Sequence, residues 1–303
     1  MEGVRPTHTT TETPSAPSRP SVSKSKATLA LLALSVGGFG IGLTEFVIAG
    51  LLTEVATDLE VTISQAGHLV GGYALAVVPG ALAITPLLMR KTPKHALVLL
   101  LAFFVAGNTL SAWAPSYEVM FTGRIIAALA HGGYFGIGAV LASTLVPEHR
   151  RASAVAALFA GLTIANVLGV PAGAFIGQQL GWRTVFWIIS AIGILALAGL
   201  ICLVPKTQPE QDQLPIAQQF RTLVRPQVLV SLLTTAMVFG GMFGVFTYIE
   251  PLLREVTGYS ASAVPGCWCS SEQASLPGTS SAVGQPTKTP TTQYWSSRSC
   301  CPQ

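Results

Sequence analysis

The stretch ATLALLALSVGGFGIGLTEFVIAGLL, residues 27–52, decides the class of fold. It is longer than the roughly 20 apolar residues that an α-helix needs to cross a bilayer. One acidic residue, Glu45, interrupts it about 10 Å of helix from the nearer end, too far for so short a side chain to reach water easily. A mid-membrane charge costs roughly 2.5–3.5 kcal/mol, so acidic residues there usually face an aqueous cavity and handle protons, ions or cationic substrates. The alternative is a protonated carboxyl that hydrogen-bonds to a neighbouring helix.

The composition extends this interpretation to the whole chain. Of 303 residues, half are hydrophobic and only 10% are charged, against about 25% in an ordinary soluble domain. The chain is therefore predicted to be an all-α, polytopic membrane protein. Apolar windows of sufficient length predict seven spans, at residues 27–52, 65–89, 96–114, 117–146, 153–180, 184–204 and 228–253.

The polar segments suggest how these spans are organised. Residues 1–26 are rich in Thr, Ser and Pro and predict a disordered tail, whereas residues 27–204 predict a six-helix bundle. The polar segment 205–226 predicts a loop, and residues 227–265 predict a seventh helix that begins a second bundle. The predominantly apolar composition ends near residue 265, so residues 266–303 predict a second disordered tail.

Basic residues alternate with acidic ones along the loops. The predicted cytoplasmic loops carry Lys24, Lys26, Arg90, Lys91, Lys94, Arg150, Arg151, Lys206, Arg221 and Arg225. The opposite loops carry Glu54, Asp58, Glu60 and Glu118, with Arg183 and Arg254 as exceptions. By the positive-inside rule, the N-terminus and the loop 205–226 are predicted to be cytoplasmic.

Two spans carry small residues at every fourth position. In the fifth span, Ala165, Gly169, Gly173 and Gly177 should line one face and let a neighbouring backbone approach, while Pro171 should bend or loosen the helix. In the fourth span, Ala128, Gly132 and Gly136 follow Arg124 at the same step, and His131 lies near that face. Ordinary helix packing accounts for the glycines, but an arginine inside a span needs an internal partner.

These residues resemble a known family. GLTEFVIAGLL at 42–52, RIIAALAHGG at 124–133, and the row from Gly161 through Asn166, Gly169, Pro171 and Gly173 are similar to motifs of the major facilitator superfamily. Within it they look most like the drug:proton antiporters and the sugar or chloramphenicol efflux group. The loop after the second span keeps the basic residues Arg90, Lys91 and Lys94 of the family pattern but has no Asp.

The resemblance implies two six-helix bundles that rock about a midplane site to give alternating access. It implies proton-coupled export of drugs or sugars, with Glu45 as the proton site and Arg124 and His131 as its polar neighbours. Substrate-binding candidates, each of which packing would equally explain, are Tyr73, Asn108, Tyr134, Phe135 and Asn166.

The last residues admit three interpretations. Cys267, Cys269, Cys300 and Cys301 lie there, but their spacing is unlike that of common zinc sites. A location outside the cytoplasm, where the predicted topology after the seventh span places this tail, would allow disulfides to form. The interpretation we favour is a frameshift: in another frame, the codons from Cys267 to Ser270 can read Leu-Val-Phe, which continues a membrane helix. In that frame, residues 278–287 can read Asn-Val-Val-Gly-Gly-Arg-Pro-Ala-Asp, which resembles a loop of the same family.

Two functions from different classes remain. The first is a secondary transporter in the cytoplasmic membrane, whose partners are protons, a small-molecule substrate and lipid. The second is a truncated membrane fragment that does not transport. The sequence predicts no enzyme, cofactor or metal site, since catalytic and phosphate-binding motifs are missing. It predicts no nucleic-acid binding, because the basic residues lie at membrane edges, and it does not define the oligomeric state.

Overall fold

The computed structural model describes residues 24–205, 221 and 224–256, and every element in these ranges is a helix. Residues 1–23 of the first predicted tail lie outside the described residues, but Lys24, Ser25 and Lys26, which the sequence assigns to that tail, form the first turn of a helix. The second predicted tail, with four of the five cysteines and the proposed frameshift, also lies outside the described residues. Seven of the described helices are long and apolar enough to cross a membrane, which confirms the expected number of spans.

Several spans are built from more than one helical segment. The first consists of α1 (Lys24–Phe46), the 3₁₀ turn η1 (Val47–Leu51) and α2 (Leu52–Asp58), so it extends beyond the predicted 27–52. The other segments are α3 (Ile63–Pro79), the π turn η2 (Gly80–Ile84), α4 (Thr85–Met89), α5 (Pro93–Trp113), α6 (Tyr117–Thr144), the short 3₁₀ turn η3 (Glu148–Arg150), α7 (Arg151–Ile164), the π turn η4 (Ala165–Gly169), α8 (Val170–Leu180), α9 (Trp182–Leu203), α11 (Pro226–Thr247) and α12 (Ile249–Glu255).

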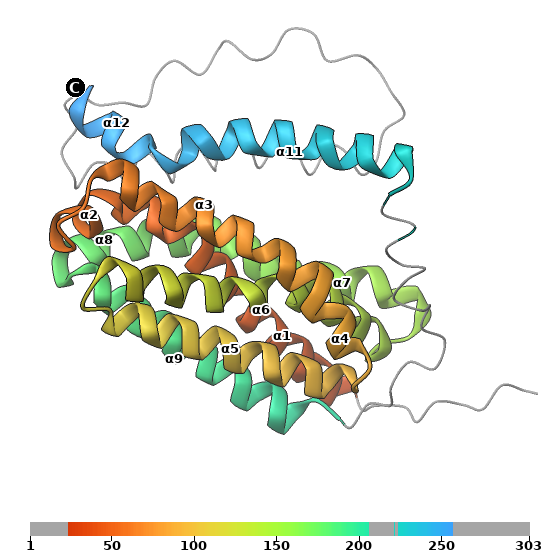
Figure 1. Ribbon diagram of the computed structural model, residues 1–303. Coiled ribbons are helices and arrows are strands. Elements are labelled where there is room, and N and C mark those ends of the chain that lie inside the picture. Colours follow the sequence, from red (N-terminus) through yellow and green to blue (C-terminus); the bar gives the residue numbers. More distant parts are fainter. Residues whose placement is uncertain (1–23, 206–220, 222–223, 257–303) are drawn as a thin grey trace, which may run out of the picture.

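The predicted seventh span, 228–253, is wrong as a single helix. The structure ends α11 at Thr247 and starts α12 after a break at Tyr248. Pro251 gives the physical reason, because proline has no N–H to bond the carbonyl of Thr247 four residues earlier. The break redirects the chain and places α12 against the first span, as Figure 1 shows in blue.

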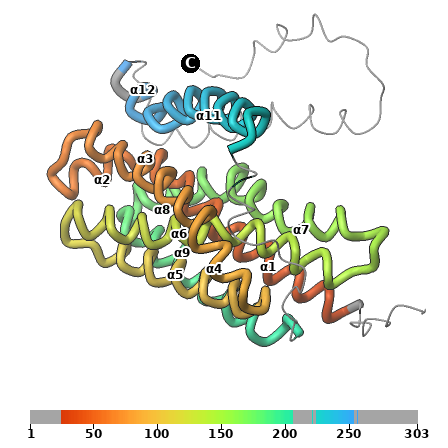
Figure 2. Tube along the Cα trace, turned by 45° about the vertical axis from the view of Figure 1, so that its right-hand side comes forward, coloured from red at the N-terminus to blue at the C-terminus, as the bar shows by residue number. Residues whose placement is uncertain are grey.

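The first six spans pack as one bundle around a continuous hydrophobic core. Helix α5 packs on α6 and α9, α1 packs on α7 and α9, and α3 packs on α6. The seventh span lies along one side of this bundle, beside α3, in both Figure 1 and Figure 2.

The glycine row of the fifth span faces the first span, as expected from its spacing. Gly169, Gly173 and Gly177 are buried against side chains of α1 and η1. At these three glycines the nearest atoms therefore belong to side chains and not to the neighbouring backbone. Direct backbone contact occurs eight residues before Gly169, where a Cβ on Gly161 would overlap the carbonyl oxygen of Ser35. Two residues before Pro171 the helix widens into the π turn η4, which confirms that the helix loosens near this proline.

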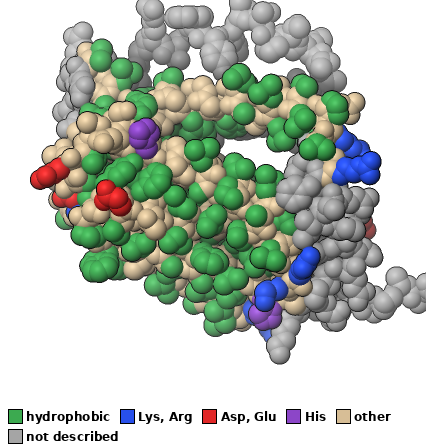
Figure 3. Space-filling model, in the orientation of Figure 1, with side chains coloured by type: hydrophobic (Ala, Val, Ile, Leu, Met, Phe, Trp, Pro, Cys, Tyr) green, Lys and Arg blue, Asp and Glu red, His purple; other side chains and the backbone are tan. Residues whose placement is uncertain are grey.

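The two ends of the bundle differ in charge. Acidic side chains gather at the end that carries α2, and basic ones gather at the opposite end (Figure 3). Arg183, an exception to this pattern in the sequence, is paired with Asp58 and donates to the carbonyl of Ala114 at 2.8 Å. At the basic end, Lys94 donates to the carbonyls of Ile201 and Val204 at 2.7 and 2.6 Å and so caps α9. We call these the acidic end and the basic end.

Candidate functional site

Three helices bring a polar cluster together inside the bundle. Helix α1 supplies Thr44 and Glu45, α3 supplies Tyr73, and α6 supplies Arg124 and His131. The side chains of Glu45 and His131 are 22% and 16% exposed, whereas Arg124 is only 1% exposed. A partly accessible carboxyl therefore lies beside a fully buried cation.

Arg124 is held by the first span. Its Nη1 donates to the carbonyl oxygen of Thr44 at 2.5 Å and approaches the Thr44 hydroxyl at 3.3 Å. Its guanidinium carbon lies 4.2 Å from the centroid of the Tyr73 ring, a favourable cation–π position. Within the described residues, Nε and Nη2 of Arg124 have no hydrogen-bond partner. The guanidinium thus keeps donor capacity for a further acceptor.

His131 joins Tyr73 to Glu45. The Tyr73 hydroxyl lies 3.2 Å from Nδ1 of His131, and the same nitrogen lies 3.9 Å from Oε2 of Glu45. The latter contact is an ion pair only when the imidazole carries a proton. Nδ1 has either one lone pair or one proton, so it can bond the Tyr73 hydroxyl or the Glu45 carboxylate, but not both together.

Behind this cluster, Thr44 links Arg124 to the third span. The Thr44 hydroxyl donates to Oδ1 of Asn108 at 2.6 Å, and Nδ2 of Asn108 donates to the carbonyl of Phe104 at 2.8 Å. Sequence reasoning missed Thr44, because a lone threonine in a helix usually bonds its own backbone. Its position next to Glu45 was the only available signal.

The predicted substrate-binding residues occupy different environments. Tyr73, Asn108 and Tyr134 are buried, and the Tyr134 hydroxyl donates to the carbonyl of Leu34 at 2.8 Å. Phe135 is half-buried, with its ring edge-on to His131 and stacked on Phe159.

Asn166 lies in the π turn η4, and its Oδ1 is buried without a partner among the described residues. Its binding role, like those of the other four, stays a prediction.

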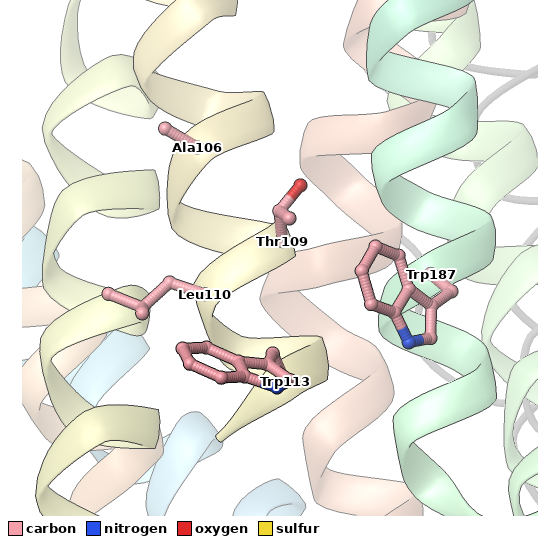
Figure 4. Close-up of a pocket in the computed structure, with 5 residues that line it drawn as sticks. All are labelled: Ala106, Thr109, Leu110, Trp113 and Trp187. Carbon is pink, nitrogen blue, oxygen red and sulfur yellow. The ribbon is translucent and has the colours of Figure 1, made fainter.

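A hollow lies on the surface of the bundle, lined by none of the residues of this cluster. It measures about 430 Å³ and lies between α5 and α9, with Trp113 and Trp187 as its largest walls (Figure 4). Trp113 is 72% exposed, and the lining contains no charged side chain. Such a shallow, apolar groove suits lipid chains better than proton chemistry, so we place the candidate site at the Glu45 cluster.

Comparison with known proteins gives the family. Residues 34–298 match the sequence profile of the Major Facilitator Superfamily. The inner membrane transport protein YdhP of Escherichia coli is 43% identical over 231 residues, which cover 75% of this chain and 58% of YdhP. A chloramphenicol resistance protein of Streptomyces lividans is 31% identical over 233 residues, covering 76% of this chain and 59% of that protein. The chain thus spans somewhat more than half the length of these relatives.

Solved structures show the same fold. A bacterial homologue of the lysosomal transporter Spinster, in an inward-facing and unoccupied conformation, superposes with a TM-score of 0.70 at 20% identity, covering 85% of this chain and 62% of that one. The xylose transporter XylE of E. coli superposes with a TM-score of 0.60 at 17% identity, covering 86% and 70%. These structural matches show the fold. The family profile and the curated relatives show that the chain belongs to the Major Facilitator Superfamily of membrane transporters.

Proposed function

We propose that this chain belongs to a proton-coupled exporter of small molecules, drugs or sugars, which works by alternating access in the cytoplasmic membrane. The observation that carries this proposal is the placement of Glu45, a partly exposed carboxyl beside a buried, incompletely bonded Arg124. The relative from S. lividans is a chloramphenicol resistance protein, which supports export rather than uptake.

The unused donors of Arg124 suggest how protonation is coupled to conformation. A buried cation with unbonded N–H groups is costly, and a carboxylate is the acceptor that satisfies it best. Glu45 lies close enough to influence Arg124 electrostatically. A deprotonated Glu45 is therefore drawn toward Arg124, whereas a protonated Glu45 is released, so the two forms favour different arrangements of the first and fourth spans.

The distribution of charge supports a cytoplasmic N-terminus. The basic end carries Arg90, Lys91 and Lys94, and α1 begins at the same end (Figures 1 and 3). The positive-inside rule then places the acidic end on the outer side of the membrane.

The test measures substrate flux, and the pH change that accompanies it, in proteoliposomes. The full chain is reconstituted around a pH-sensitive dye, and chloramphenicol and arabinose are supplied as probes under an imposed pH gradient. We expect Glu45→Gln to abolish both substrate flux and the matching pH change, because the amide cannot bind and release a proton. Glu60→Gln, which removes an exposed acidic group at the acidic end, is the matched control and should retain both signals.

Two results would contradict the proposal. Undiminished coupled transport by Glu45→Gln would exclude this carboxyl as the proton site. Absence of transport by the unmodified chain, for both probes, would favour the non-transporting fragment.

A further inference from the structure

Among the described residues, the seventh span packs on the bundle near the acidic end, where α11 meets η1 and α12 meets η1 and α2. The Phe46 ring, at the end of α1, stacks on Phe243 of α11 with centroids 5.6 Å apart and meets Phe246 edge-on at 5.8 Å. Along α11 before these rings, every side chain except the half-buried Val228 is exposed. Figure 3 shows an opening between this part of α11 and the bundle.

A polar pair closes the same end. Oγ1 of Thr53, in α2, donates to Oε2 of Glu250, in α12, at 2.7 Å. Glu250 is completely buried and Thr53 is half-buried, so this hydrogen bond joins the two spans within a largely buried contact. The two residues are 197 positions apart along the chain, so the bond exists only while the seventh span is docked at this end.

A close steric contact lies beside this pair. The Tyr248 side chain, at the break between α11 and α12, lies over Gly67 of α3, and a Cβ on Gly67 would come within 2.7 Å of its Cζ. One helical turn further along α3, Gly71 has nothing within 4 Å of the equivalent position. The fit between Tyr248 and α3 therefore depends on the glycine at position 67.

We propose that Thr53, Glu250, Gly67 and Tyr248 form a latch that closes the passage at the acidic end and opens once in each transport cycle. The proposal rests on the proposed transport function. Its physical basis is that both contacts, the hydrogen bond and the steric fit, exist in only one arrangement of the spans. Contacts made in one of two states shift the equilibrium toward that state by the free energy of those contacts.

The pair of Thr53 and Glu250 suits a reversible latch better than an apolar contact would. A hydrogen bond to a carboxylate is strong when buried. When the spans separate, both groups are rehydrated, and water replaces the lost bond. The latch therefore stabilises the closed state without preventing its opening.

The experiment measures access to a cysteine behind the latch. Ala74 lies on the same face of α3 as Gly67, two turns further in, and is exposed in the structure. With the five native cysteines replaced by serine, Ala74→Cys is labelled by a membrane-impermeant maleimide added at the acidic end. Vesicles with that end facing the reagent are recognised by labelling of Glu60→Cys. No transported substrate is needed, so a failure of the latch is distinguishable from a failure of the proposed function.

We expect Thr53→Val and Glu250→Met each to raise the labelling rate about tenfold, because each removes one partner of the hydrogen bond. The double variant should label no faster than the faster single variant, since both changes break the same bond. Thr53→Ser keeps the hydroxyl, and Glu60→Gln leaves the latch intact, so both should label at the original rate.

A steric variant keeps the proposal testable if the polar variants fold poorly. Gly67→Ala should wedge Tyr248 away from α3 and raise the labelling rate, whereas Gly71→Ala makes the same chemical change in open space and should not. Equal labelling in Thr53→Val, Glu250→Met and Glu60→Gln would overturn the latch. So would equal rates in the two glycine variants, or independent, multiplicative effects in the double variant.

Discussion

At the scale of single residues, the sequence shows which charged residues lie inside apolar spans, but it does not show which residues they contact. Glu45 and Arg124 stand out because a charge inside a span needs a reason. The structure indeed brings them into one cluster. Glu250 meets the same criterion, as an acidic residue within a predicted span, but its importance emerges only from the structure. Thr44 and Thr53 could not be predicted, because their partners lie 64 and 197 residues away along the chain.

Thr44 provides a prediction at this scale. The Thr44 hydroxyl donates to Oδ1 of Asn108 and lies 3.3 Å from Nη1 of Arg124. Thr44→Val removes this hydroxyl, so the buried Asn108 oxygen loses its donor and the buried Arg124 guanidinium loses one acceptor. We expect a loss of about 1 kcal/mol of stability, the range measured for polar contacts between membrane helices. The measurement is the thermal unfolding midpoint in detergent, followed by intrinsic tryptophan fluorescence.

The matched control for Thr44→Val is Thr163→Val. Thr163 is exposed, and its hydroxyl donates only to the carbonyl of Phe159, within its own helix. If both variants unfolded at the same temperature, the bridge from Arg124 to Asn108 would not contribute to stability.

At the scale of elements, the length of the apolar segments predicts the number of membrane spans. It does not predict local irregularities of the backbone within those spans. The expected number of seven spans is confirmed. The π turns at Gly80–Ile84 and Ala165–Gly169 are not predictable in this way, because a π turn depends on how neighbouring helices accommodate an extra residue. Similarly, Pro251 is visible in the sequence, but the new direction of α12 depends on its contacts with the first span.

Gly161 gives the prediction at this scale. It is buried where α7 meets α1, and Ser35 at this crossing also donates to the carbonyl of Ala157 at 2.5 Å. Gly161→Ala would force the two backbones apart, and overpacking of this kind costs typically about 1–3 kcal/mol. We expect a lower unfolding temperature and a lower yield of folded protein.

The control at this scale is Gly136→Ala in α6. Gly136 is exposed and has nothing within 4 Å of the place where a Cβ would lie, so alanine there should be neutral or should stabilise the helix by up to about 1 kcal/mol. Equal unfolding temperatures for the two alanine variants would show that α1 and α7 can separate at Gly161 without cost.

At the scale of the whole molecule, charge determines how the bundle is oriented in the membrane. In the sequence, Arg183 is an exception to the positive-inside pattern, and the structure explains it. Its charge is offset by Asp58, and its guanidinium also binds the carbonyl of Ala114, so Arg183 ties together three loops of the acidic end. A paired arginine of this kind should count little toward topology, whereas the exposed Arg90 and Lys91 count fully.

The orientation can therefore be predicted and measured on the full chain. In the cysteine-free background, Glu60→Cys and Lys91→Cys place one thiol at each end of the bundle, both at exposed positions. In intact spheroplasts, an impermeant maleimide should label Glu60→Cys and spare Lys91→Cys until the membrane is permeabilised. The reverse pattern would place the N-terminus outside. It would also turn the latch of Thr53 and Glu250 into a gate on the cytoplasmic side, because the latch lies at the same end of the bundle as Glu60.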